Sequence, residues 1–328
     1  MKRSAFIHMG LTKTGTTSIQ SCFYGSRRTL LRNGTLYPGF ARNHSTAVAT
    51  AFLESPHALL MNVVAGKDNP QAGRAASAHW MRKFQQALAT PGWQRLLLSG
   101  EGLCDLPPPR MAALRDRLGE CCATVTAVIC LRHPLRWRIS QTQQMLKLGS
   151  TIEAEIRRLS RPGHYQRMVE KIEAVFERGN VRILIFEELQ AHPQGLVAGF
   201  IDTLGLRPGF PATLRAPDRN ASMSLTASLV LDRLNREVPM FVGGRMNPHR
   251  SLHVERVLRR IPGPKFQLDA GQVACFRQAV EADRDWARAR FGREVWQDLP
   301  ASAPATVTPP RHLGPLLAMG RLAGRLVP

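Results

Sequence analysis

The chain has 328 residues and a hydrophobic content of 44%, which is ordinary for a globular protein with a buried core. Its 45 Lys and Arg residues outnumber 24 Asp and Glu residues, so a formal charge of +21 predicts an acidic partner, unless it reflects a compositional bias towards scattered arginines. No apolar run reaches 18 residues, so a membrane-spanning helix is not expected. No nucleic-acid motif occurs, so a nucleic-acid partner is not expected. The six cysteines show no regular spacing, so a disulfide scaffold is not expected either.

Short apolar runs alternate with helical patterns over the first two-thirds of the chain. Buried strands are predicted at residues 5–9, 93–103, 124–132 and 181–189. Helices are predicted at residues 16–30, 46–64, 74–90, 107–120, 164–178 and 194–205, and directly after 132 with Pro134 in the first turn. Continuous apolar strands of this kind predict an α/β fold. Its sheet is mostly parallel with helices on both faces, as in the three-layer sandwich of P-loop nucleotide-binding proteins.

Beyond about residue 210 the pattern is helical and irregular, and we interpret it as a helical C-terminal extension of one domain that spans residues 1–298. Residues 299–328 are rich in Pro and Ala and basic, which favours a flexible tail. The alternative is a short basic amphipathic segment that touches a membrane. The cysteine pattern favours a reduced, cytoplasmic protein, with peripheral contact at the inner membrane left open.

The segment FIHMGLTKTGTTSIQ, residues 6–20, joins a predicted strand to a predicted helix through a glycine-containing turn. Unpaired N–H groups and the helix dipole make such a turn an anion site. The Walker pattern G-x-x-x-x-G-K-[ST] can be placed on Gly10–Thr17, but Thr16 occupies its lysine position and Lys13 lies inside the loop instead. Hydroxyl groups for the same anion come from Thr16, Thr17 and Ser18.

A second anion site is predicted in VICLRHPLRWRIS. Arg132 stands at the carboxyl end of a buried strand, and Ser140 follows eight residues later, about two helical turns on. Ligands of parallel sheets bind at the carboxyl ends of strands, so Arg132 and the opening loop are expected to line one crevice. A guanidinium and a hydroxyl suit a phosphate dianion. The alternative is that Arg132 pairs with a carboxylate at the sheet edge.

These motifs together resemble a known family. KTGTTS after a short strand is similar to the 5′-phosphosulfate loop of bacterial, P-loop-like sulfotransferases that use 3′-phosphoadenosine-5′-phosphosulfate (PAPS), and LRHPLRWRIS is similar to their 3′-phosphate motif. RILIFEEL and RNASMSL (219–225) resemble two further segments, so the resemblance spans residues 5 to about 225. It implies PAPS as donor and no metal, with nucleotide contacts from Lys13, Thr14, Gly15, Thr16, Thr17, Ser18, Arg132 and Ser140. Contacts from Asn220 and Ser222 are left open.

The implied reaction moves a sulfuryl group to an acceptor hydroxyl or amine, and Lys13 would stabilise charge on the departing phosphate oxygen. A triphosphate enzyme needs a carboxylate for magnesium, whereas the strand at 124–132 ends in Arg132. ILIFEE (183–188) mimics such a carboxylate motif, although Glu187 or Glu188 is better interpreted as a helix cap or an arginine partner. Two alternatives stay open: a kinase-like phosphotransferase that uses ATP and magnesium, and a non-catalytic anion-binding protein.

An acceptor hydroxyl must lose its proton, and a positioned Glu or His usually takes it. Glu101 follows the second apolar strand and ranks first, since glycan- and tyrosine-directed sulfotransferases resemble this arrangement in using a glutamate base. His44 ranks second, and His8 is expected to be structural. The positive charge favours an acidic saccharide or a glycolipid as acceptor, and the oligomeric state is not predicted.

Overall fold

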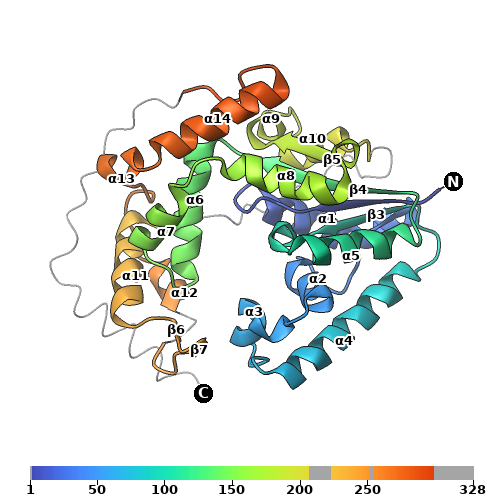
Figure 1. Cartoon of the computed structure of the whole chain (residues 1–328), viewed down its shortest axis with the longest axis horizontal. Helices are drawn as coiled ribbons and strands as arrows, with labels where there is room; N and C mark the ends of the chain where they lie inside the picture. The colour runs from blue at the N-terminus through green and yellow to red at the C-terminus, as the bar shows by residue number, and fades with distance from the viewer. Residues whose placement is uncertain (1, 207–222, 251–253, 299–328) are drawn as a thin grey trace. The chain divides into compact units, whose positions relative to one another are not determined.

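The computed structural model describes residues 2–206, 223–250 and 254–298. The chain divides into two compact units (Figure 1): unit 1 comprises residues 1–133 and 165–218, and unit 2 comprises residues 134–164 and 219–328. The segment 134–164 therefore groups with the C-terminal helices. Asn220, Ser222 and the tail 299–328 lie outside the described residues, so the predictions about them stay predictions.

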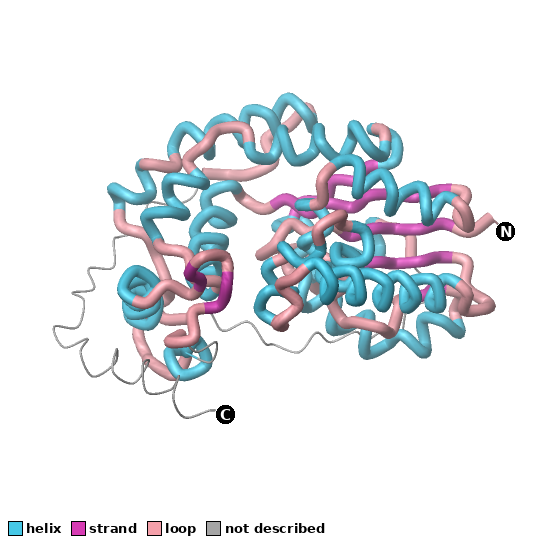
Figure 2. Tube along the Cα trace, turned by 60° about the horizontal axis from the view of Figure 1, so that its bottom comes forward, coloured by secondary structure: helices cyan, strands magenta, loops and turns pink. Residues whose placement is uncertain are grey.

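Unit 1 is built on a parallel sheet, as predicted. Its strands in the described chain are β1 (Ser4–His8), β2 (Thr35–Leu36), β3 (Arg95–Ser99), β4 (Thr124–Leu131) and β5 (Val181–Ile185), in the order β2-β3-β1-β4-β5. Figure 2 shows these strands running side by side. Consecutive residues such as Leu96, Leu97 and Leu98 are all buried, because helices cover both faces of the sheet.

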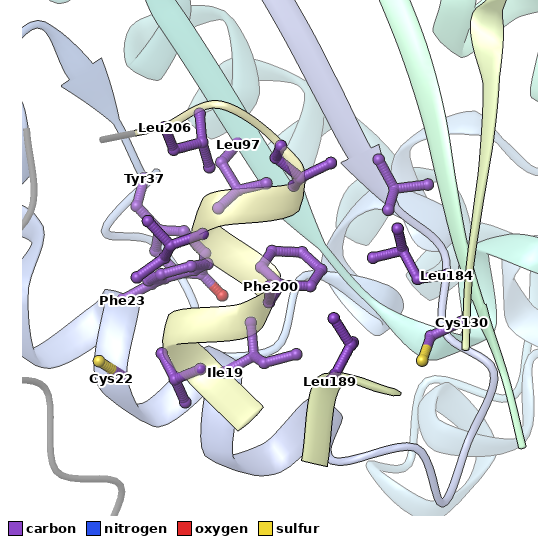
Figure 3. Close-up of a cluster of buried hydrophobic side chains, with 14 of the residues drawn as sticks. Ile19, Cys22, Phe23, Tyr37, Leu97, Cys130, Leu184, Leu189, Phe200 and Leu206 are labelled. Carbon is purple, nitrogen blue, oxygen red and sulfur yellow. The ribbon is translucent and has the colours of Figure 1, made fainter. Parts of the chain in front are cut away.

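One face is covered by α1 (Thr16–Arg32), α9 (Phe186–Gln190) and α10 (Leu196–Thr203). Ile19, Phe23 and Phe200 pack there against Leu97 and Leu184 (Figure 3). On the other face lie α5 (Pro108–Gly119) and α8 (His164–Phe176), which are joined by a hydrogen bond from Arg115 to the Val175 carbonyl. The α/β fold with helices on both faces is thus confirmed.

Several predicted boundaries differ from the structure. The predicted strand 181–189 ends at Ile185, because Glu187 and Glu188 favour a first helical turn, in α9. The predicted helix 46–64 is divided, since Pro56 interrupts it. Its parts are α2 (Ser45–Phe52), the 3₁₀ turn η1 (Pro56–Ala58) and α3 (Leu60–Val64). The next helix along the chain is α4 (Pro70–Leu88). Strand β3 is followed by a 3₁₀ turn, η2 (Glu101–Asp105), and β5 is preceded by η3 (Arg178–Asn180).

Unit 2 is mainly helical, as the pattern beyond 210 predicted. Its elements are α6 (Pro134–Lys147), α7 (Ile152–Leu159), α11 (Leu225–Glu237), the hairpin β6 (Phe241–Val242) and β7 (Arg245–Met246), α12 (Val254–Leu258), α13 (Ala270–Ala274) and α14 (Arg277–Phe291). Helix α6 is joined to α14 by an ion pair between Arg138 and Asp283, 2.6 Å long, with both side chains fully buried. In the described residues no helix is long and apolar enough to cross a membrane.

Candidate functional site

The loop between β1 and α1 is attached to the neighbouring strand. The Met9 N–H donates to the Val128 carbonyl at 2.8 Å, and the Leu11 N–H donates to the Cys130 carbonyl at 3.0 Å. These bonds extend the β1–β4 pairing past the end of β1, so the first part of the loop follows β4 to its carboxyl end. The predicted anion loop and the predicted arginine therefore meet at one edge of the sheet.

The second half of the loop turns through the left-handed region. Lys13 and Gly15 have φ values of 65° and 79°, and the Thr14 hydroxyl donates to the Leu11 carbonyl at 2.6 Å. A Cβ on Gly15 would lie 2.8 Å from the Leu196 methyl groups of α10, so glycine is required there. The Thr14 hydroxyl is buried and engaged inside the loop, which gives that side chain a structural role; its contact with nucleotide stays a prediction.

Helix α1 begins without a side-chain cap in the described structure. Its N-cap residue is Gly15, and its first turn carries no acidic residue. The backbone N–H groups of Ser18 and Ile19 bond to the Gly15 carbonyl. The first amides of the helix thus form the kind of terminus that binds an anion, and the contacts predicted for the hydroxyls of Thr16, Thr17 and Ser18 stay predictions.

Arg132 contacts the loop directly. Its Nη1 donates to the Lys13 carbonyl at 2.9 Å, and its guanidinium lies 5.0 Å from the centre of the Phe186 ring. The Arg132 carbonyl accepts a 2.6 Å hydrogen bond from the Tyr165 hydroxyl. The structure therefore brings together two of the residues that the sequence assigned to one nucleotide, Lys13 and Arg132.

Glu187 stabilises the chain directly after Arg132, where its Oε1 accepts a 3.0 Å hydrogen bond from the His133 N–H. The carboxylate of the apparent ILIFEE motif thus takes part in fixing the end of β4. Ser140 lies on α6, in unit 2, so its predicted contact with the nucleotide stays a prediction.

Glu101 is held at the same edge of the sheet. A Cβ on Gly10 would lie 3.0 Å from the Glu101 Cα and Cβ atoms, so the acid packs directly on the loop. Its Oε2 accepts hydrogen bonds from Gln20 Nε2 at 2.9 Å and from Asn43 Nδ2 at 3.1 Å. Within the described ranges Oε1 accepts no hydrogen bond, so one oxygen is oriented by two amides and the other is left for a proton.

His44 is fully buried, and both of its ring nitrogens are engaged. Nδ1 accepts from the Ser99 N–H at 3.0 Å, so Nε2 carries the hydrogen and donates to the Pro38 carbonyl at 2.9 Å. Burial lowers the pKa of His44 to about 4. This geometry gives His44 a structural role and does not support the catalytic role that the sequence ranked second.

His8 is also buried, as expected for a structural residue. Its Nδ1 lies 2.9 Å from the Ser99 hydroxyl, and burial lowers its pKa to about 3. Sequence reasoning missed Gln20 and Asn43, the two amides on Glu101. They stand 81 and 58 positions from it, and no local pattern marks such long-range partners.

No group of three or more His, Cys, Asp or Glu side chains is placed to hold a metal ion in the part of the chain that the structure describes. No protein-family model matches the chain, and no curated protein matches it.

Solved structures that are similar to the chain include two sulfotransferases. One is a sulfotransferase from Alicyclobacillus acidocaldarius, with 19% identity and a TM-score of 0.39 over 72% of this chain and 93% of that one. The other is the sulfotransferase domain from the curacin biosynthetic pathway, with 11% identity and a TM-score of 0.38 over 92% and 99%. Both TM-scores lie below 0.5.

Proposed function

We propose that the chain is a sulfotransferase that moves a sulfuryl group from PAPS to a hydroxyl or amine of an acceptor. The observation that carries the proposal is the hydrogen bond from Arg132 to the Lys13 carbonyl. It joins the two motifs that resemble the donor site, one at the start of α1 and one at the end of β4. An oriented carboxylate, Glu101, packs on Gly10 of the same loop.

The donor is proposed to lie along this edge of the sheet. The amides and hydroxyls at the start of α1 would bind the 5′-phosphosulfate, because a helix N-terminus favours an anion. The Lys13 ammonium would stabilise the charge that develops on the bridging oxygen as the sulfur–oxygen bond breaks. Arg132 would bind the 3′-phosphate through charge-assisted hydrogen bonds.

Glu101 is proposed as the general base. The acceptor oxygen attacks sulfur, its proton passes to Oε1 of Glu101, and the bond from sulfur to the nucleotide phosphate breaks to release adenosine 3′,5′-bisphosphate. Gln20 and Asn43 hold Oε2, so the carboxylate keeps one orientation while Oε1 takes the proton. A positioned base of this kind contributes a factor of about 10²–10⁴ in rate.

Calorimetry with adenosine 3′,5′-bisphosphate tests the donor site. Lys13→Ala and Arg132→Ala should each weaken binding by about 1.5–3 kcal/mol, because each removes charge-assisted hydrogen bonds to phosphate. The matched controls are Lys67→Ala and Arg95→Ala. Lys67 is an exposed lysine after α3, and Arg95 is the first residue of β3, at the amino ends of the strands. Both variants should bind the bisphosphate as the unchanged chain does.

Equal affinity for adenosine 3′,5′-bisphosphate in all four variants would contradict the proposed donor site. ATP with magnesium is titrated in parallel, and tighter binding of ATP than of the bisphosphate would support the kinase-like alternative instead. Transfer from labelled PAPS to pooled glycan and glycolipid acceptors then tests the activity itself.

A further inference from the structure

A pocket of about 500 Å³ lies beside the edge strand β2, between the chain after that strand and the C-terminal half of α4. Its volume is in the range of pockets that hold small ligands. All of its residues belong to unit 1: Leu36, Pro38, Gly39, Phe40, His79, Trp80, Lys83, Gln86, Ala87 and Thr90. The donor site does not use this pocket.

The pocket combines aromatic rings with polar groups at its rim. Half-buried Phe40 and Trp80 have ring centres 6.1 Å apart and are tilted by 56°, so both contribute to an apolar wall. Lys83 and Gln86 are exposed, and Thr90 is half-buried. Lys83 forms no ion pair with the residues that the structure describes, so its ammonium is available to an anionic group.

These groups define the chemistry of an occupant. It needs an apolar face for the rings, hydroxyl groups for Gln86 and Thr90, and a negative charge for Lys83. We propose that this pocket binds a saccharide unit that carries a carboxylate, such as a uronic acid residue of a glycan. A flat aromatic acid would contact the rings and the ammonium but would form no hydrogen bonds with Gln86 and Thr90, which water would then have to satisfy.

A short stretch of chain connects the pocket to Asn43, which contacts the candidate base Glu101. Phe40 stands three residues before Asn43, which donates to Glu101, and three residues span at most about 11 Å. The intervening loop is fixed, because the Phe40 ring lies 5.0 Å from the ring of His44 and His44 is bonded to Ser99 and Pro38. The wall of the pocket is thus tied to the residue that holds Glu101, and we infer that a glycan of a few units with one hydroxyl at Glu101 extends into the pocket.

The pocket is thus an acceptor subsite, an assignment that rests on the proposed function, whereas saccharide binding itself does not. The binding experiment titrates the full chain with a disaccharide that contains glucuronic acid. Parallel titrations use the same disaccharide with its carboxylate reduced to an alcohol, and 4-hydroxybenzoate. Tryptophan fluorescence and calorimetry report the dissociation constants.

We expect the acidic disaccharide to bind best. Trp80→Ala should weaken its binding about tenfold, because the stacking surface is lost. Lys83→Gln should remove its preference over the reduced disaccharide, about two- to fivefold for an exposed charge. Arg82→Gln is the matched control: it makes the same charge change on the adjacent residue of α4, outside the pocket, and should bind as the unchanged chain does.

The pocket assignment would be overturned if the unchanged chain bound no saccharide. It would also be overturned if the Trp80→Ala and Lys83→Gln variants bound the acidic disaccharide as tightly as the unchanged chain does. If 4-hydroxybenzoate bound more tightly than the acidic disaccharide, the ligand of the pocket would be an aromatic acid and not a saccharide. Saccharide binding should persist in Lys13→Ala, which lacks the donor lysine. If the saccharide binds while the bisphosphate does not, the proposed function is wrong and the pocket assignment holds. If the bisphosphate binds while the saccharide does not, only the pocket assignment is wrong.

Discussion

Substitution of Glu101 by Gln separates the proton transfer from the rest of the site. The Gln carbonyl oxygen can occupy the position of Oε2 and still accept from Gln20 and Asn43, so both hydrogen bonds of 2.9 and 3.1 Å persist. A bond to a charged acceptor is worth about 1.5–3 kcal/mol and a neutral one about 0.5–1.5 kcal/mol. Two such exchanges lower the free energy of unfolding by about 2 kcal/mol, which leaves the chain folded.

Turnover should fall much further than stability. An amide cannot take the acceptor proton, so loss of the base should lower the transfer rate by about 10²–10⁴-fold, or about 3–5 kcal/mol of barrier. Affinity for adenosine 3′,5′-bisphosphate should stay within about twofold, because the donor groups are unchanged. The assay compares labelled transfer from PAPS with calorimetric binding of the bisphosphate in the same preparation.

The matched control is Glu120→Gln, which changes an exposed carboxylate at the opposite end of the sheet, between α5 and β4. A Glu101→Gln variant that transfers sulfuryl groups at the normal rate would show that the base lies elsewhere. Loss of bisphosphate binding in this variant would show instead that Glu101 supports the donor loop and not the proton transfer.

Three further predictions concern the structure around the site and the second unit. Gly10→Ala should lower both stability and turnover, because its Cβ would lie 3.0 Å from Glu101 at a φ of 96°; urea unfolding together with the transfer assay measures both losses. The pKa of His44 is about 4 in the folded chain and near 6.5 when unfolded, so its contribution, about 3 kcal/mol, is present above pH 6.5 and is lost as the pH falls towards 4. Urea titrations should therefore show a shallower decline of stability over that window in His44→Asn, and an unchanged slope would contradict the assigned pKa. Asp283→Ala should destabilise the chain by about 3–5 kcal/mol, since it leaves the Arg138 guanidinium buried without its carboxylate; a melting temperature equal to that of the unchanged chain would refute this.

The fold and the turn between β1 and α1 were predictable because they depend on local patterns. The apolar run at 124–132 predicted a buried strand, and the glycines and hydroxyls at 10–18 predicted a strand-to-helix turn; both are present. Element ends were less predictable. The strand at 181–189 lost its last four residues to a helix, because the local run of apolar and acidic residues suits either state.

The partners of individual side chains could not be predicted. Gln20 and Asn43 reach Glu101 only because α1, the loop after β2 and η2 converge at one edge of the sheet. His44 was a reasonable base from its position in a loop, but tertiary packing buried it and engaged both nitrogens. Such partners depend on how distant segments meet, which no spacing in a single sequence encodes.

The close approach of Gly10 to the backbone and Cβ of Glu101 links the two parts of the proposed site, the donor loop and the base. Any side chain at position 10 displaces the acid, and any shift of the acid towards the loop is stopped by the main chain. If Glu101 is the base and the loop binds the donor, as we propose, selection for a different acceptor hydroxyl cannot move the Glu101 carboxylate towards the loop without also changing the donor contacts. Under this proposal, divergence among proteins with this arrangement should concentrate in the proposed acceptor pocket and leave the contact between Gly10 and Glu101 unchanged.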